Sequence, residues 1–233
     1  MSVSENYLEV VRRKNEAAIR SNRNPEDVLL LAVTKLHGLE EINEAIQAGA
    51  SDAGENRVQE LLEKYGKTVH PVNWHLIGHL QTNKVKSIID KVVMIHSVDS
   101  FKLAKEINKR AANADLVMDV LIEINIGMEE SKSGIAPEDV EALVKEITSE
   151  CDHVRVRGVM CVPPHGDTPE DSRKYFKQTR EIFEKLQSLN FPADRAQLDT
   201  LSMGMSGDFE VAIEEGATIV RVGSSIFGKR DYR

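Results

Sequence analysis

The chain has 233 residues, of which 41% are hydrophobic and 29% charged, and its formal net charge is −8. These values are typical of a globular protein, and an α/β barrel of this length forms one domain. The negative charge argues against nucleic acid or an anionic membrane as the main partner. The N-terminal residues lack the apolar core of a signal peptide, and no segment reaches the length of a membrane span. We therefore expect a cytoplasmic protein, with Cys151 and Cys161 as reduced thiols.

The first predicted elements are an amphipathic helix from about Ser4 to Arg20 and, after a turn at Asn24–Asp27, the apolar run Leu29–Lys35. A short apolar run bounded by turn residues predicts a strand buried on both faces, as in a parallel sheet. Helical spacing follows from Gly38 to Gly49, where the glycine is suited to ending the helix.

The same pattern of strand followed by helix repeats along the whole chain. The further predicted strands cover residues 52–56, 73–78, 92–98, 118–125, 154–162, 198–203 and 218–223. Eight such units without a helix-only or strand-only block indicate a parallel sheet, and eight strands close a (β/α)8 barrel. An open sheet suits the sequence less well, because no Gly-rich dinucleotide motif follows the first strand. We predict a single α/β domain over residues 1–233, a TIM-type barrel with an extra N-terminal helix.

In such a barrel the active site lies at the carboxyl ends of the strands, and the first strand ends on Lys35. Desolvation at this position would lower the pKa of a lysine and supply the neutral amine that a Schiff base needs. A lysine that only extends from the strand end into solvent explains the same pattern. Lys35 alone therefore does not decide between these interpretations.

Two strand-end clusters favour a phosphate site. Leu201–Asp208 follows the seventh strand, and Val220–Ser225 covers the eighth strand and the turn after it. Glycines and small hydroxyls let backbone N–H groups approach an anion, and barrels frequently hold phosphate after strands seven and eight. Arg221 lies within the eighth strand and is expected to point into the site or the barrel interior, where it needs an acceptor.

Other polar residues at strand ends are weaker candidates. His75 and His79 have the spacing of metal ligands, but the segment is predicted to be strand and loop, so we expect no metal. Glu130–Gly134 is interpreted as a solvated loop from which Lys132 can face the barrel mouth. Taken singly, His96 and Asn125 are interpreted as ordinary strand-end residues.

An imine-forming lysine, a phosphate cradle and an inward arginine together suggest a phosphorylated aldehyde cofactor. Pyridoxal phosphate fits, with an imine to Lys35, the phosphate at Ser202, Gly223 and Ser224, and the ring nitrogen near Arg221. A Schiff-base aldolase that acts on a sugar phosphate fits the same pattern. The spacing of the residues leaves both open.

Six segments in this order resemble the pyridoxal phosphate homeostasis proteins, and the similarity runs from about Leu8 to Tyr232. The segments are Val33–Lys35, Gly54–Asn56, His75–Gln81 with Asn83–Lys84, Ser131–Gly134, Leu201–Ser206 and Arg221–Gly228. The resemblance implies a barrel of the alanine racemase N-terminal type that binds pyridoxal phosphate without established turnover.

By this resemblance the cofactor-binding residues are Lys35 as the imine lysine, Asn56 lining the pocket, Ser202, Gly223 and Ser224 around the phosphate, and Arg221 facing the pyridine nitrogen. Met203 is also assigned to the cofactor-binding set. The resemblance also implies a part in vitamin B6 homeostasis, with apo pyridoxal phosphate-dependent enzymes as candidate recipients. We expect a monomer without a nucleic-acid or membrane partner. Lys84 and Lys132 have no assigned role.

The chemistry of these residues favours cofactor binding over catalysis. Arginine does not give up its proton, so a ring nitrogen facing Arg221 stays unprotonated and the ring is a poor electron sink. An amino-acid racemase, the alternative enzyme, also needs a second base on the opposite face of its substrate. Tyr232 is the tyrosine nearest the last strand, and we do not expect it to reach the site.

Overall fold

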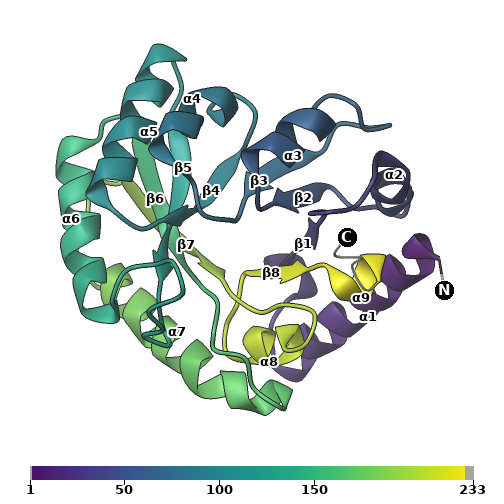
Figure 1. Ribbon diagram of the computed structural model, residues 1–233. Helices are drawn as coiled ribbons and strands as arrows, with labels where there is room; N and C mark the ends of the chain where they lie inside the picture. Colours follow the sequence, from purple (N-terminus) through teal and green to yellow (C-terminus); the bar gives the residue numbers. More distant parts are fainter. Residues whose placement is uncertain (1, 229–233) are drawn as a thin grey trace.

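The computed structural model describes residues 2–228, and eight parallel strands form a closed barrel at its centre (Figure 1). Each strand pairs with its neighbour in sequence, and β1 pairs with β8 through Leu31 and Arg221 to close the sheet. The strands are β1 Leu29–Val33, β2 Asp52–Glu55, β3 Asn73–Leu76, β4 Met94–Val98, β5 Met118–Ile124, β6 Val154–Cys161, β7 Ala196–Ser202 and β8 Ile219–Val222. The predicted TIM-type barrel is confirmed.

Helices cover the outside of the barrel (Figure 1). They are α1 Val3–Arg20, α2 Leu39–Gln47, α3 Val58–Lys64, α4 Val85–Ile88, α5 Phe101–Asn113, α6 Val140–Glu150, α7 Arg173–Gln187, α8 Phe209–Glu214 and α9 Ser224–Phe227. Short 3-10 turns cover Pro25–Asp27, Thr82–Lys84, Pro137–Asp139 and Pro169–Ser172. None of the helices in residues 2–228 is long and apolar enough to cross a membrane.

The core has two layers because side chains alternate between the two faces of a strand. The large layer lies between strands and helices, and the small one fills the barrel with Leu31, Met94, Leu121, Met160 and Ile219. The small layer lies inside the barrel, so the polar residues that also point inward must find partners among themselves. Both cysteines are buried free thiols, as predicted.

The predicted N-terminal helix is α1, and it packs against α8, α9 and α2 on the outside of the barrel. A capping box between Ser2 and Glu5 begins the helix, which buries Tyr7, Val10 and Ala17 against the barrel. The helix therefore covers the seam where β1 meets β8 (Figure 1).

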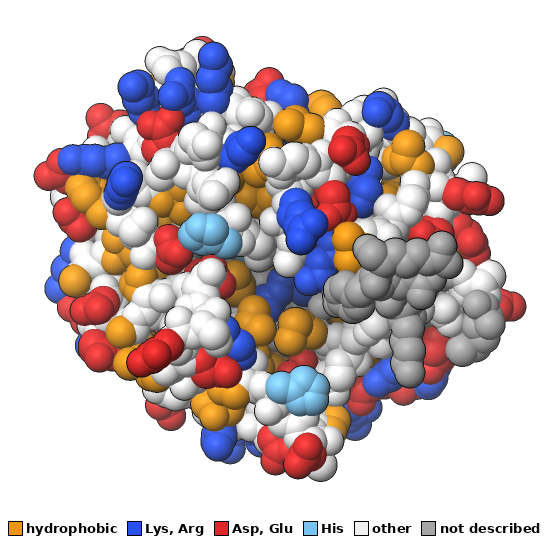
Figure 2. Space-filling view, viewed as in Figure 1, with side chains coloured by type: hydrophobic (Ala, Val, Ile, Leu, Met, Phe, Trp, Pro, Cys, Tyr) orange, Lys and Arg blue, Asp and Glu red, His pale blue; other side chains and the backbone are white. Residues whose placement is uncertain are grey.

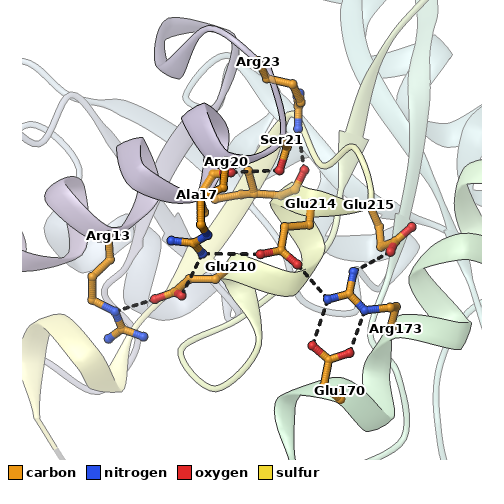
Figure 3. A network of polar contacts seen from close by, with 11 residues as sticks. Arg13, Ala17, Arg20, Ser21, Arg23, Glu170, Arg173, Glu210, Glu214 and Glu215 are labelled. Carbon is orange, nitrogen blue, oxygen red and sulfur yellow. Dashed lines mark hydrogen bonds and ion pairs between the residues drawn. The ribbon is translucent and has the colours of Figure 1, made fainter.

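Ion pairs connect α1 to α8 and then to α7 (Figure 3). Arg13 pairs with Glu210 at 2.7 Å, and Arg20 reaches both Glu210 and Glu214. Arg173 then pairs with Glu214 at 2.7 Å. Partly exposed pairs of this kind each contribute about 0–1 kcal/mol to the free energy of folding. The network therefore helps to align α1, α8 and α7 on the outside of the barrel but adds little to the stability of the fold.

The strand pairing is irregular between Val156 and Gly158 of β6, where the register shifts by one residue against β5 and by two residues against β7. Gly158 has a φ of +150°, and a Cβ at this position would lie 1.8 Å from the carbonyl oxygen of Thr200 on β7. The backbones of β6 and β7 approach here more closely than a side chain allows.

We predict that Gly158→Ala lowers the free energy of unfolding by at least about 2 kcal/mol, because the new methyl group forces two strands of a closed barrel apart. Gly207→Ala is the matched control, since a Cβ there meets nothing within 4 Å, and it should stay within about 0.5 kcal/mol of the parent. Urea unfolding followed by circular dichroism measures both. Equal stability of the two variants would contradict the prediction.

Candidate functional site

The predicted site residues gather at one end of the barrel because all eight strands are parallel. Lys35 comes two residues after β1, Asn56 directly after β2, Ser202 and Met203 at the end of β7, Arg221 in β8, and Gly223 and Ser224 directly after β8. Figure 2 shows a hollow near the middle of the face in view, with basic and hydrophobic side chains in it. The sequence therefore located the mouth of the barrel correctly.

Arg221 lies inside the barrel and is 4% exposed. Its Nη1 donates to Ser202 Oγ at 2.7 Å, and its Nη2 donates to the backbone oxygen of Cys161 at 2.8 Å. Burial lowers the pKa of Arg221, and the acidic side chains of Glu123 and Asp208 act in the opposite direction. The predicted inward arginine is thus confirmed, together with the acceptors that it requires.

Ser202 is fully buried, and its hydroxyl lies between Arg221 and His96. The distance from Ser202 Oγ to His96 Nδ1 is 3.1 Å. His96 lies in β4 inside the barrel, so its interpretation as an ordinary strand-end residue was wrong. The phosphate contact assigned to Ser202 stays a prediction, and its hydroxyl is already engaged on both sides.

The loops after β7 and β8 meet through Ser206, which the sequence placed in the right cluster without assigning it a role. Ser206 Oγ accepts hydrogen bonds from the backbone N–H groups of Gly223 and Ser225, each at 3.2 Å. Asp208 accepts from the backbone N–H of Met205 at 2.7 Å and from Ser172 Oγ at 2.8 Å, which closes the first loop. Two N–H groups therefore converge on one oxygen atom at this turn.

Asn56 is half-buried at the end of β2 and lies against the next strand end. A Cβ on Gly78 would lie 2.4 Å from the backbone oxygen of Asn56, so only glycine permits this approach. The close contact fixes the backbone of Asn56 at the rim of the barrel. Met203 is fully buried, and its backbone N–H donates to Ile219 in β8.

The backbone on either side of Lys35 is held by a buried polar cluster on the outer face of the sheet. Lys64 Nζ donates to the backbone oxygen of Thr34 at 2.8 Å and to Glu55 Oε1 at 2.7 Å. Thr34 Oγ1 donates to the same Glu55 oxygen at 2.5 Å. On the other side, Leu36 has a positive φ of 65°, and its N–H donates to Glu60 at 2.7 Å.

This cluster, Thr34, Glu55, Glu60 and Lys64, fixes the path of the chain through Lys35, which is itself half-buried. A non-glycine residue with positive φ persists only where its surroundings hold it, and the Leu36 N–H bond to Glu60 does so. Burial raises the pKa of Glu55, with Lys64 and Thr34 opposing the shift. Sequence inspection missed this cluster.

Glu123 in β5 is a second acid that sequence inspection missed. Burial, and secondarily the charge of Asp99, raise the pKa of Glu123 to about 7, although Arg221 acts in the opposite direction. Its Oε2 atom is buried and has no hydrogen-bond partner. A carboxyl group of this kind changes charge near neutral pH.

The remaining strand-end candidates lie in different surroundings. His79 is exposed and lies 3.6 Å from Asp99, whereas His75 points into the barrel. No group of three or more possible ligands in residues 2–228 is arranged to hold a metal ion. Lys132 donates to the backbone oxygen of Pro163 at 3.0 Å and lines a cavity of about 420 Å³ between the loops after β6 and β7. It therefore lies beside the mouth of the barrel.

Comparison with known proteins supports the resemblance seen in the sequence. The family model described as "Alanine racemase, N-terminal domain" matches residues 12–231. The pyridoxal phosphate homeostasis protein of Aquifex aeolicus is 47% identical over 233 residues, covering all of both chains. The chain belongs to the pyridoxal phosphate homeostasis protein family.

Two further relatives agree. The family member from Pseudomonas aeruginosa is 40% identical and covers 99% of this chain and 97% of its own length. PipY of Synechococcus elongatus, solved with pyridoxal phosphate bound, is 34% identical with a TM-score of 0.79. It covers 94% of this chain and 100% of its own. The similarity to these relatives thus covers nearly the whole chain.

We predict that Lys64→Met lowers the free energy of unfolding by about 3 kcal/mol, because it leaves the buried carboxylate of Glu55 unpaired. The double variant Lys64→Met with Glu55→Leu removes both charges and should recover most of the loss. Urea unfolding of the parent, both single variants and the double variant completes the cycle. A double variant no more stable than Lys64→Met would contradict the ion pair as the source of the effect.

We also predict that Glu123 makes the fold less stable as pH rises from about 4.5 to about 7, the range between its ordinary pKa and its raised one. The folded state binds the proton more tightly, so stability is complete below this range and falls by up to about 3 kcal/mol above it. Glu123→Gln should lose this slope, whereas the exposed control Glu130→Gln should keep it. Urea unfolding at pH 5 and pH 8 gives the change in the free energy of unfolding with pH for the parent and for both variants. The same change in Glu123→Gln as in the parent would refute the assignment.

Proposed function

We propose that this chain binds pyridoxal 5'-phosphate at the mouth of the barrel and takes part in vitamin B6 homeostasis by holding the cofactor without turnover. Its family and the relatives' names support this, as does PipY, which was solved with the cofactor bound. The observation that carries the proposal is the turn after β8, where the N–H groups of Gly223 and Ser225 converge on one oxygen.

The residues at the mouth fit this cofactor. Two convergent N–H groups beside small side chains suit a phosphate oxygen, for which Ser206 Oγ is a stand-in. We assign the phosphate to Gly223, Ser224 and Ser225, and keep Ser202 in the site with a role that acts through Arg221. Asn56 lines the pocket, and the fully buried Met203 supports the end of β7 beside it.

Lys35 is assigned to hold the aldehyde group. When bound, the cofactor supplies an aldehyde that condenses with an amine and a ring that withdraws electrons. The cluster of Thr34, Glu55, Glu60 and Lys64 limits how far the Lys35 backbone can move, which lowers the entropy lost on attachment.

Arg221 supports storage of the cofactor over turnover. Its guanidinium keeps its proton, so it donates to a ring nitrogen without protonating it, and the ring draws electrons weakly. Among the tyrosines of residues 2–228, Tyr7 of α1 is buried in the core between helices and strands, Tyr65 lies beside Lys91, and Tyr175 lies beside Lys174. None of these three belongs to the strand-end cluster, which argues against a racemase that uses a tyrosine base.

One observation favours the alternative, an enzyme that is either an amino-acid racemase or a Schiff-base aldolase. The pKa of Glu123, raised to about 7, suits a group that exchanges protons at neutral pH. Steady turnover of an amino acid or a sugar phosphate by the purified chain, abolished by Lys35→Ala, would establish this alternative and overturn the storage function.

The proposal also covers the domain organisation, the oligomeric state, the location and the partners of the chain. The whole chain, residues 1–233, forms one domain and acts as a monomer in the cytoplasm. Apo enzymes that depend on pyridoxal phosphate receive the cofactor from it. Neither nucleic acid nor a membrane is a partner, in keeping with the net charge of −8.

We predict that the chain mixed with pyridoxal phosphate develops an imine absorbance band in the near-ultraviolet to visible range. Borohydride should bleach this band and leave the cofactor covalently attached to Lys35. Lys35→Ala should lose the band and the attachment, because no other amine is assigned to the aldehyde. Lys105→Ala, a change on α5 away from the mouth, is the control and should keep both. Absorbance spectra and mass spectrometry of peptides provide the measurement. Attachment at a different lysine would show that the site is misassigned.

A further inference from the structure

A line of buried polar side chains crosses the barrel interior from the start of β2 to Arg221. Asp52 Oδ1 lies 3.0 Å from His75 Nε2, and His75 Nδ1 lies 2.9 Å from His96 Nε2. His96 Nδ1 lies 3.1 Å from Ser202 Oγ, which accepts from Arg221 Nη1 at 2.7 Å. All five residues are at most 6% exposed.

We propose that Asp52, His75 and His96 are positioning residues, which form with Ser202 a hydrogen-bond relay of one fixed proton order that orients Arg221 toward the cofactor ring. The inference rests on the proposed function, because Arg221 is assigned to the ring nitrogen there. The relay consists of Asp52, His75, His96 and Ser202, and it ends at Arg221.

The stagger of the barrel strands explains why these residues meet. Asp52 pairs with Asn73 across β2 and β3, so His75 lies two residues further along on the same face. His75 pairs with Met94 across β3 and β4, and His96 again lies two residues further along. From β2 to β3 and from β3 to β4, each member of the relay therefore lies two residues beyond the partner of the preceding one.

The chemistry of the two ends fixes the order of the protons. Arginine can only donate, so Ser202 Oγ accepts from Arg221 and gives its own hydrogen to His96 Nδ1. Burial, together with the nearby His75 and Arg221, lowers the pKa of His96 well below its ordinary value, so His96 is neutral. With Nδ1 accepting, its hydrogen is on Nε2 and is donated to His75.

At the other end, Asp52 is an acceptor. Although burial acts in the opposite direction, hydrogen bonds from His75 and Ser51 lower the pKa of Asp52, so its carboxyl group is ionised. His75 Nδ1 accepts from His96, and His75 Nε2–H donates to Asp52. In this order every hydrogen in the relay has an acceptor and every acceptor has a donor.

The reversed order leaves a hydrogen without a partner in the relay. If His75 donated from Nδ1, His96 would donate from Nδ1 to Ser202, whose oxygen would then accept from both His96 and Arg221. The hydroxyl hydrogen of Ser202 would point away from both. The carboxylate of Asp52 thus determines, through two imidazoles, how Ser202 presents its lone pairs to Arg221.

The first test is made on the chain without cofactor. Nitrogen-15 spectra of the imidazoles should place the proton on Nε2 of both His75 and His96. Asp52→Leu leaves the Nε2 hydrogen of His75 without its acceptor, so the order is no longer fixed from that end and a fraction of His96 should carry its proton on Nδ1. Asp119→Leu removes another inward carboxylate, one that pairs with Arg155 and Arg157 outside the relay, and should leave the proton on Nε2. A proton on Nδ1 of His96 in the parent overturns the proposal.

The second test measures cofactor binding by absorbance. Asp52→Leu and Ser202→Ala should each weaken the affinity for pyridoxal phosphate about tenfold, the loss expected when one hydrogen bond of a charged group is misaligned. Asp119→Leu should bind as the parent does, and Ser202→Ala provides the answer if Asp52→Leu fails to fold. Parent-like affinity in Ser202→Ala overturns the proposal. If the parent itself binds no cofactor, the proposed function fails, and the imidazole spectra alone decide the proton order.

Discussion

The interior arrangement of this barrel depends on the burial of one cation, the guanidinium of Arg221. Taking a charged group out of water is costly unless acceptors surround it, and here β6 supplies the backbone oxygen of Cys161 while β7 supplies Ser202. Ser202 can accept from Arg221 and still use its own hydrogen only if a further acceptor lies behind it. That requirement leads to His96, then to His75, and ends at the carboxylate of Asp52.

Lys35 is positioned from the opposite face of the sheet. The ammonium of Lys64 binds the carbonyl oxygen of Thr34, and Glu60 binds the N–H of Leu36, so both neighbours of Lys35 are fixed by side chains from α3. The two lysines thus have different roles. Lys64 is buried and paired with Glu55, where it holds the backbone, whereas Lys35 lies at the mouth of the barrel. An interior network and an exterior one therefore converge on the same rim.

The barrel itself could be predicted because hydrophobic periodicity and strand–helix alternation determine it, and the strand ends then located Lys35, Arg221 and the loop around Gly223. The inward direction of Arg221 followed from its place within a strand. The partners could not be predicted, since they depend on register. His75 and His96 meet only because His75 pairs with Met94, and no spacing in the sequence reveals that pairing. The apolar run from Val92 to Val98 around His96 was the available signal, because such a run is typical of a strand that is buried on both faces.

The strand β2 shows how both networks constrain the sequence. Asp52–Glu55 is a poor strand by composition, yet all four residues are buried. Asp52 points inward to His75, and Glu55 points outward to Lys64, as alternation over three residues requires. A shift of one residue would exchange the two faces and leave both carboxylates without their partners. The register of β2 is therefore set by its two buried acids rather than by apolar packing, so the strand that contributes least to the core fixes both Arg221 and Lys35.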